Sequence, residues 1–376
     1  MATTLTMWDF SWLVRAHGAE AEYADLERVL DELAERDYDV VRIDAYPHLI
    51  AAGSGGGRRE RTTVLPQADW LMWGNHAPVE VEPAAALVRF LALARERGRR
   101  VALASWFLED EDGRAAAVVT PADFARGWGE TLALIEREGL LDVVACVDLA
   151  NEWPIASWCG GAHAAIFGAG GRGGVGERWS ARELTGIASY FTAIDPLRER
   201  WPQLRYTFSF ADAFPSLREL DVSRFDLLDV HLWLDTADEE WARRTEPFAP
   251  TTGEPGALQR HVDLVWEAYW PERDRWLGAL LRSLDAQAAW ARERGLALWT
   301  TESWASVIWE GLPTPDGRDA WDYVRDVSEI AAVAAAQRGW EGICSSSFSQ
   351  PHFPGMWDDA SWHRRLNARV RGAAGG

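Results

Sequence analysis

Lysine is absent from this 376-residue chain, so arginine supplies all 38 basic side chains. Without lysine no Schiff base can form, which excludes lysine-dependent aldolases and pyridoxal phosphate enzymes. The phosphate-binding loop GxxxxGK[ST] is excluded for the same reason. The chemistry of this protein therefore has to come from other side chains.

Positive charge and cysteine are also scarce. The formal net charge is −20, which argues against nucleic acid and against an anionic membrane surface, because both bind clusters of basic residues. The three cysteines, Cys146, Cys159 and Cys344, form no CxxC pair and predict buried, reduced thiols. No signal peptide and no apolar run of membrane-spanning length is visible, so the sequence as given reads as that of a cytoplasmic protein.

Tryptophan, in contrast, is abundant, with 23 copies. Flat amphipathic rings beside glycine, proline and acidic residues favour a cleft that stacks on a flat, weakly polar ligand such as a sugar face. Packing in a large core is the commoner role for any single tryptophan. We expect the tryptophans that follow strand ends to face the ligand, namely Trp8, Trp106, Trp233 and Trp304.

Short apolar runs alternate along the chain with amphipathic helical segments. We expect the helices near residues 23–35, 83–97, 121–138, 180–200 with an interruption near 195–196, a short one near Ser216, and then 271–294, 319–337 and 360–371. Eight such strand–helix units predict a parallel sheet closed into a (β/α)8 TIM barrel that forms one domain over residues 1–376. Segments 51–82, 153–179 and 235–270 predict long loops over the C-terminal face, where barrel sites lie.

Polar and aromatic side chains stand at the end of every predicted strand. They are Trp8 and Asp9, Arg42 and Asp44, Ser105 and Trp106, Asn151 and Glu152, Ser209 and Asp212, His231 and Trp233, Glu302 and Trp304, and Ser347 and Gln350. The strongest signal is the pair Glu152 and Glu302, on the fourth and seventh strands. Glycoside cleavage needs two carboxyl groups, because one protonates the leaving oxygen while the other attacks the anomeric carbon or activates water.

Four short motifs carry a family resemblance. "VVRID" on strand two, "LANEWP" on strand four, "DVHLW" on strand six and "TTESW" on strand seven resemble the clan of retaining β-glycosidases that includes the cellulases of glycoside hydrolase family 5. The resemblance implies a β-glycoside or small oligosaccharide as substrate. The family usually has a tyrosine where this chain has Trp233, a histidine on strand three and a tryptophan on strand eight, and these departures argue against cellulose itself.

The resemblance also implies roles for single residues. Glu152 would be the acid/base and Glu302 the nucleophile, while Asn151 would bind the sugar 2-hydroxyl. Arg42 would hold the nucleophile ionised and His231 would order the pair. We expect further contacts with the carbohydrate from the other strand-end residues, namely Trp8, Asp9, Asp44, Trp106, Trp233 and Trp304. No cofactor or metal is implied, and the oligomeric state stays open.

Two other functions remain open at this stage. A metal-dependent sugar isomerase or epimerase could use Glu152, Asp212, His231 and Glu302 as ligands, although HxH and HExxH motifs are absent. A barrel that binds sugar without cleaving it would not need both carboxylates.

Overall fold

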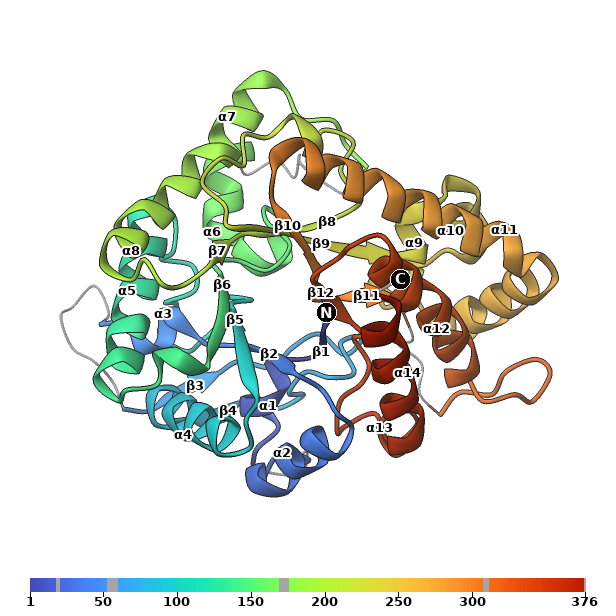
Figure 1. Cartoon of the computed structure of the whole chain (residues 1–376), viewed down its shortest axis with the longest axis horizontal. Helices are drawn as coiled ribbons and strands as arrows, with labels where there is room; N and C mark the ends of the chain where they lie inside the picture. Colours follow the sequence, from blue (N-terminus) through green and yellow to red (C-terminus); the bar gives the residue numbers. More distant parts are fainter. Residues whose placement is uncertain (18–20, 53–59, 169–175, 307–310, 375–376) are drawn as a thin grey trace.

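The computed structural model describes residues 1–17, 21–52, 60–168, 176–306 and 311–374. Parallel strands form a central barrel and the helices surround it (Figure 1). In spatial order the strands are β1 (Thr3–Asp9), β2 (Val40–Asp44), β5 (Arg100–Ala104), β6 (Val144–Asp148), β7 (Tyr206–Thr207), β8 (Ser209–Ala211), β9 (Leu227–Trp233), β10 (Ala297–Thr300) and β12 (Gly342–Cys344). Since β7 pairs with β6, β8 pairs with β9 and β12 pairs with β1, the sheet closes.

The closed sheet confirms the predicted (β/α)8 barrel. The short strands β7 and β8 together occupy its fifth position, and β11 (Ser303–Trp304) continues β10 alongside β9. The extent of a single domain over the whole chain stays a prediction.

Side chains fill the barrel in layers. The floor is an apolar cluster built from Leu5, Val40, Ala102, Ala145, Cys146, Leu227, Trp299 and Cys344. The Trp299 ring lies so close to Gly342 that a Cβ at that position would stand 2.2 Å from it, so only glycine fits there. Because side chains alternate along a strand, Arg42, Asp148 and Asp229 come two residues further along β2, β6 and β9, above this floor. A buried charged layer thus lies between the floor and the mouth.

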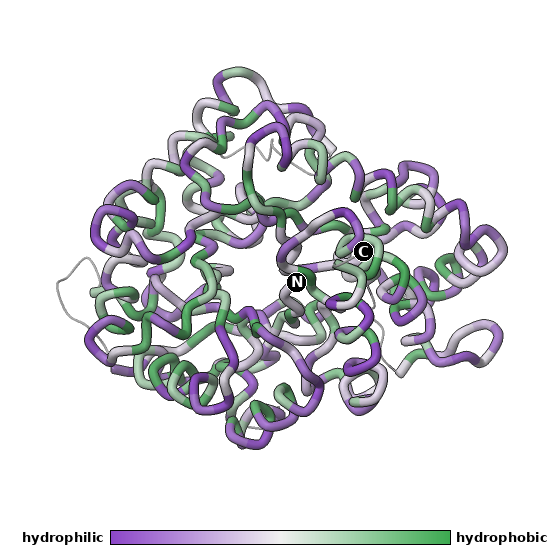
Figure 2. The backbone as a smooth tube through the Cα atoms, in the orientation of Figure 1, coloured by the Kyte–Doolittle hydropathy of each residue, from purple (hydrophilic) through white to green (hydrophobic). Residues whose placement is uncertain are grey.

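Most outer helices begin and end close to the positions that the sequence predicts. The outer helices are α2 (Leu26–Glu35), α4 (Pro83–Glu96), α5 (Pro121–Arg137), α7 (Ala181–Ser189), α8 (Ile194–Arg200), α11 (Ala257–Arg294), α12 (Trp321–Gln337) and α14 (Ala360–Ala373). Ser180 and Glu183 form the capping box that opens α7, with each side chain accepting the other's backbone N–H. Apolar segments face the space between helices and barrel, and hydrophilic ones lie at the outer turns (Figure 2).

One helix differs from the prediction. Helix α11 begins at Ala257, well before Pro271, because a kink with non-helical angles at Glu272 lets the chain continue through the proline. Between β8 and β9 the chain forms the short 3-10 helix η3 (Leu217–Glu219), which agrees with the short helix expected near Ser216.

The long segments over the mouth contain their own elements. Strands β3 (Thr62–Val64) and β4 (Val79–Val81) form an antiparallel pair, and α1 (Ser11–Val14), α3 (Pro47–Ile50), α6 (Ala156–Phe167), α9 (Leu234–Ala237), α10 (Glu239–Thr245) and α13 (Pro354–Trp357) are short helices. All three cysteines are free and buried, as predicted. Within the described ranges, no helix combines the length and apolar character that crossing a membrane requires.

Candidate active site

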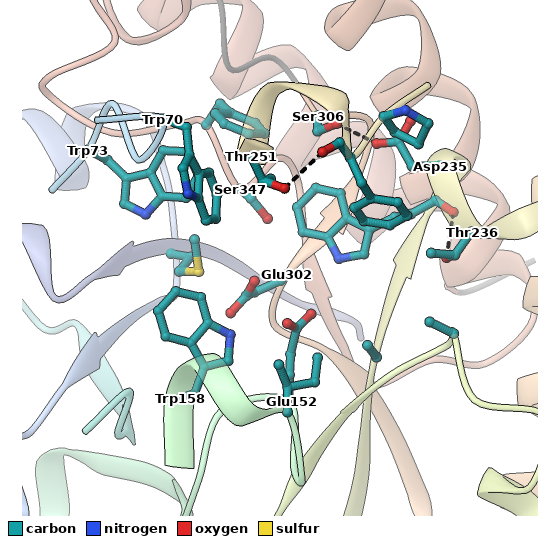
Figure 3. A pocket seen from close by; sticks show the side chains of 18 of the residues that line it. Trp70, Trp73, Glu152, Trp158, Asp235, Thr236, Thr251, Glu302, Ser306 and Ser347 are labelled. Atoms are coloured by element: carbon teal, nitrogen blue, oxygen red, sulfur yellow. Dashed lines mark hydrogen bonds between the residues drawn. The ribbon is translucent and has the colours of Figure 1, made fainter. Parts of the chain in front are cut away.

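Two carboxyl groups meet at the C-terminal mouth of the barrel. Glu152 follows β6 and Glu302 lies between β10 and β11, and both side chains point into one pocket (Figure 3). A carboxylate oxygen of each, and a ring nitrogen of His231, lie within 4.8 Å of one another. Glu152 has a left-handed backbone with φ of 47°, and its N–H donates to Ser209 Oγ at 2.9 Å. The local chain geometry therefore sets the direction of this side chain.

Arg42 links the charged layer to the mouth. Its Nη1 lies 2.5 Å from Glu302 Oε1, and its Nη2 lies 2.7 Å from Asp148 Oδ2 and 2.8 Å from Asn151 Oδ1. The guanidinium also stands over the Trp106 ring, 4.5 Å from its centroid. Since Arg42 is fully buried, this cation has its charge balanced by Glu302 and Asp148 rather than by water.

His231 connects the two carboxyl groups. Its Nδ1 lies 3.2 Å from Glu152 Oε1 and 3.8 Å from Glu302 Oε1, and its Nε2 lies 3.1 Å from Thr301 Oγ1. Burial lowers the pKa of His231, so the ring is neutral near pH 7. The Thr301 hydroxyl donates to Asp229 Oδ2 at 2.6 Å and therefore accepts the Nε2–H of His231.

This arrangement assigns the proton on Glu152. In a neutral imidazole that carries its hydrogen on Nε2, Nδ1 can only accept, so the contact with Glu152 Oε1 is a hydrogen bond when Glu152 is protonated. Burial raises the pKa of Glu152, which agrees with a protonated group. Burial also raises the pKa of Glu302, but His231 and the Arg42 guanidinium oppose that rise. Arg42 also contacts Glu302 directly, at 2.5 Å, so Glu302 is the carboxyl group that has a cationic partner for its ionised form.

The other predicted polar residues lie just beneath the pocket. Asp44 accepts the backbone N–H of Tyr46 at 2.6 Å and of Trp106 at 3.0 Å, and burial raises its pKa to about 7. Asp9 accepts the N–H of Ser11 at 2.5 Å, and burial raises its pKa to about 8. Neither carboxyl belongs to the pocket lining, so both act on the site through the backbone turns that they hold.

Asn151 has one amide nitrogen to offer. Its Oδ1 accepts from Arg42, whereas its buried Nδ2 has no hydrogen-bond partner within the described part of the chain.

Asp212, a candidate metal ligand, lies outside the Glu152–Glu302 pair. It is hydrogen-bonded to Gln287 and borders a neighbouring cleft of about 540 Å³, and burial raises its pKa to about 7.

Of the four predicted stacking tryptophans, Trp233 lines the pocket. Trp8 is fully buried and packs edge-on against Tyr23, Phe90 and Trp357 outside the barrel. Trp304 is also fully buried, and its Nε1 donates to the Cys344 carbonyl at 3.0 Å. The expectation that these two rings face a ligand is corrected by their burial, and Trp106 supports Arg42 instead.

Other aromatic side chains line the pocket in their place. Trp70 and Trp73 come from the segment between β3 and β4, Trp158 from α6, and Phe348 from the loop after β12 (Figure 3). Gln350, noted at its strand end, also contributes. The two closely spaced tryptophans in "DWLMWGN" lie within segment 51–82, which the sequence predicts to lie over the C-terminal face, but nothing in the sequence shows which side chains of that loop point into the pocket. The pocket has a volume of about 240 Å³.

A parallel barrel with paired carboxyl groups at its C-terminal mouth is an arrangement used by glycoside-binding and glycoside-cleaving proteins. The sequence profile of the sugar-binding cellulase-like family matches residues 5–371, so the chain belongs to this family. No curated protein sequence matches the chain closely enough to count as a relative.

Solved structures show the same fold. A Parabacteroides distasonis protein, named only provisionally as a glycoside hydrolase, is 31% identical over 99% of this chain and 94% of its own, with a TM-score of 0.84. A GH5_18 protein from Streptomyces cattleya in complex with GlcNAc is 13% identical over 99% and 80%, with a TM-score of 0.51. The cellulose synthase subunit Z of Clostridioides difficile is 11% identical over 98% and 99%, with a TM-score of 0.55.

Proposed function

We propose that this protein is a retaining glycoside hydrolase that cleaves a β-linked glycoside by double displacement. The observation that carries the proposal is the approach of the Glu152 and Glu302 oxygens to within 4.8 Å. Retaining enzymes hold their carboxyl groups about 5–5.5 Å apart, whereas inverting enzymes need roughly 6.5–9.5 Å to admit a water molecule. The short separation favours direct attack by a carboxylate. Family membership and the fold it shares with glycoside hydrolases support the same conclusion.

In the first step the ionised Glu302, beside Arg42, attacks the anomeric carbon and forms a glycosyl ester. Glu152 gives its proton to the oxygen of the bond that breaks, and the aglycone leaves as an alcohol. The negative charge of Glu302 disappears on esterification, so the pKa of Glu152 falls. In the second step Glu152 takes a proton from water, whose oxygen attacks the anomeric carbon and releases Glu302 as a carboxylate.

A 2-deoxy-2-fluoro glycosyl inactivator tests the assignment, because it traps the glycosyl ester. Screening aryl β-glycosides first identifies a sugar that the protein accepts. Peptide mass analysis after inactivation is then expected to find the label on Glu302, and Glu302→Gln is expected to take up none. Labelling of another residue would overturn the assignment of the nucleophile.

A metal-dependent isomerase is the second candidate, since Glu152, His231 and Glu302 have ligand atoms close enough to share a cation. Arg42 argues against it, because a guanidinium 2.5 Å from Glu302 already balances the charge that would attract the metal. Turnover of an aryl glycoside that persists after dialysis against a chelator would support the hydrolase. Absence of aryl glycoside turnover, together with an interconversion of free sugars that depends on a divalent cation, would support the isomerase class.

A further inference from the structure

The two sides of the pocket differ in the hydrogen-bonding groups that they offer. The side next to Glu152 is formed by β8, β9 and the segments after β6, β8 and β9, and its residues are mainly apolar: Ile155, Trp158, Ala211, Ala213, Trp233 and Phe248. Residues of β1 and of the loop after β12 form the opposite side, where Met7 and Phe348 are apolar and Ser347 and Gln350 are polar. Glu152 protonates the leaving oxygen in the proposed mechanism, so the apolar side is the one that faces the leaving group.

Polar groups on the apolar side already have protein partners. Thr236 Oγ1 donates to the Trp233 carbonyl at 3.2 Å, and Thr251 Oγ1 donates to the Phe248 carbonyl at 2.8 Å. Asp235 accepts from Trp241 Nε1 at 3.0 Å and from Ser306. These three side chains can still accept hydrogen bonds, but among the residues described none of the polar side-chain atoms on this side is buried without a partner.

The opposite side does contain one such atom. Gln350 Nε2 donates to the Ser347 carbonyl at 2.7 Å and to Asp9 Oδ2 at 3.3 Å. Because a carbonyl can only accept, this contact fixes which end of the amide is which. The buried Oε1 then has no partner among the residues described, and it is available to a sugar hydroxyl.

Phe248 marks where the apolar side reaches solvent. Its side chain is 51% exposed, and in the described part of the chain only Met1 is another large hydrophobic residue of comparable exposure. Phe248 lines both the pocket and the neighbouring cleft (Figure 3 shows the pocket). An exposed aromatic ring at the rim of a pocket is a typical contact for an apolar ligand group.

We infer that the substrate is a glycoside of a single sugar with a hydrophobic, ring-containing aglycone, which Trp158, Trp233 and Phe248 hold. The sugar occupies the Gln350 side and the aglycone the Glu152 side. The pocket volume of about 240 Å³ lies below the roughly 300–1,000 Å³ of sites for larger ligands, and beyond Phe248 the pocket borders the neighbouring cleft. This inference rests on the proposed hydrolysis for its orientation.

Thioglycosides test the inference without turnover, since their sulfur linkage resists hydrolysis. Calorimetry would compare the phenyl and methyl 1-thio-β-D-glycosides of glucose, galactose and mannose, and a thio-linked disaccharide of each sugar. For the sugar that binds, we expect the phenyl compound to bind about tenfold or more tighter than the methyl compound. We also expect it to bind more tightly than the disaccharide.

Phe248→Ser should reduce the preference for phenyl over methyl several-fold. Thr252→Ala is the matched control, because Thr252 is an exposed residue of the 3-10 helix η4 (Ala249–Thr252), which directly follows Phe248, and it does not line the pocket. An equal loss in both variants, a tighter disaccharide, or no binding of any phenyl compound would overturn the aglycone assignment. Labelling of Glu302 by the fluoro inactivator would still support hydrolysis in those cases, so the two failures can be told apart.

Discussion

Replacing Arg42 with methionine would show how strongly the barrel interior depends on one buried cation. The guanidinium lies 2.5 Å from Glu302 and 2.7 Å from Asp148, and its own side chain is 1% exposed. The variant leaves both carboxyl groups buried without their counter-charge. Removing one partner of a buried ion pair typically lowers stability by about 3–5 kcal/mol. We expect Arg42→Met to lower the free energy of unfolding by that amount near pH 7.

The loss should depend on pH in a defined direction. Burial raises the pKa of Asp148 and Glu302, and Arg42 opposes that rise. Without Arg42 the folded-state pKa of each carboxyl lies further above its unfolded value, so stability is present at low pH and lost as pH rises. A carboxyl that stays protonated only in the folded state lowers the free energy of unfolding by about 1.36 kcal/mol for each unit that the pH rises. Between pH 5 and pH 7, each of the two carboxyls can therefore add up to about 2.7 kcal/mol to the destabilisation.

Urea denaturation followed by tryptophan fluorescence at pH 5 and pH 7 measures this effect. Arg61→Met is the matched control, because Arg61 forms its ion pair with Glu80 at 3.2 Å while both side chains are 64% exposed. Exposed pairs contribute no more than about 1 kcal/mol, so the control should change little at either pH. Equal destabilisation of the two variants, or an Arg42→Met loss that does not grow with pH, would refute the reasoning.

Three further changes test the mouth of the barrel. Glu152→Gln should lower kcat/KM by about 10²–10⁴ for alkyl glycosides but far less for 4-nitrophenyl glycosides, whose leaving group needs no proton, and an equal loss on both would contradict the acid role. Thr301→Val should allow His231 to carry its hydrogen on Nδ1 and donate to ionised Glu152, which lowers the pKa of Glu152. The alkaline limb of the kcat/KM profile should then move to lower pH, and an unmoved limb would argue against the Thr301 contact. Gln350→Leu should lower kcat/KM about tenfold for the parent glycoside but leave one deoxy sugar unaffected, whereas a uniform loss across deoxy sugars would mean that Gln350 has no hydroxyl partner.

The site residues at the strand ends could be predicted from the sequence, because the C-terminal ends of all strands in a parallel barrel lie at the same face. The alternation of strands and helices gave the closed sheet, and the sheet brought Glu152, His231 and Glu302 together from positions far apart in the chain. The direct contact of Arg42 with Glu302 was expected only through the family resemblance. Its second partner, Asp148, lies in the charged layer through its ion pair with Arg42.

The sequence could not predict which tryptophan side chains point into the pocket. The pairing of β1 with β2 shifts register between Met7 and Asp9, and Met7 lines the pocket while Trp8 packs outside among the helices. Because side chains alternate along β1, Leu5 and Met7 point into the barrel and Trp8 points away from it. Proximity to a strand end does not by itself show which of two neighbouring residues points inward. Trp70 and Trp73 were missed for another reason. Their segment was expected over the mouth, but which of its side chains reach the pocket depends on contacts such as that between the rings of Trp73 and Phe348, whose centroids lie 6.1 Å apart.

The buried acids next to the pocket explain how the mouth keeps its shape. Four adjacent barrel strands, β1, β2, β5 and β6, are each followed or ended by a residue with left-handed backbone: Asp9, Tyr46, Phe107 and Glu152. Such a conformation costs of order 1–3 kcal/mol for a residue other than glycine, so the surroundings must hold it. Asp44 does so by accepting the N–H groups of Tyr46 and Trp106, and Ser209 does so for Glu152. The position of the proposed acid is thus fixed by a row of strained turns, and this favours a site whose geometry is set before the substrate binds.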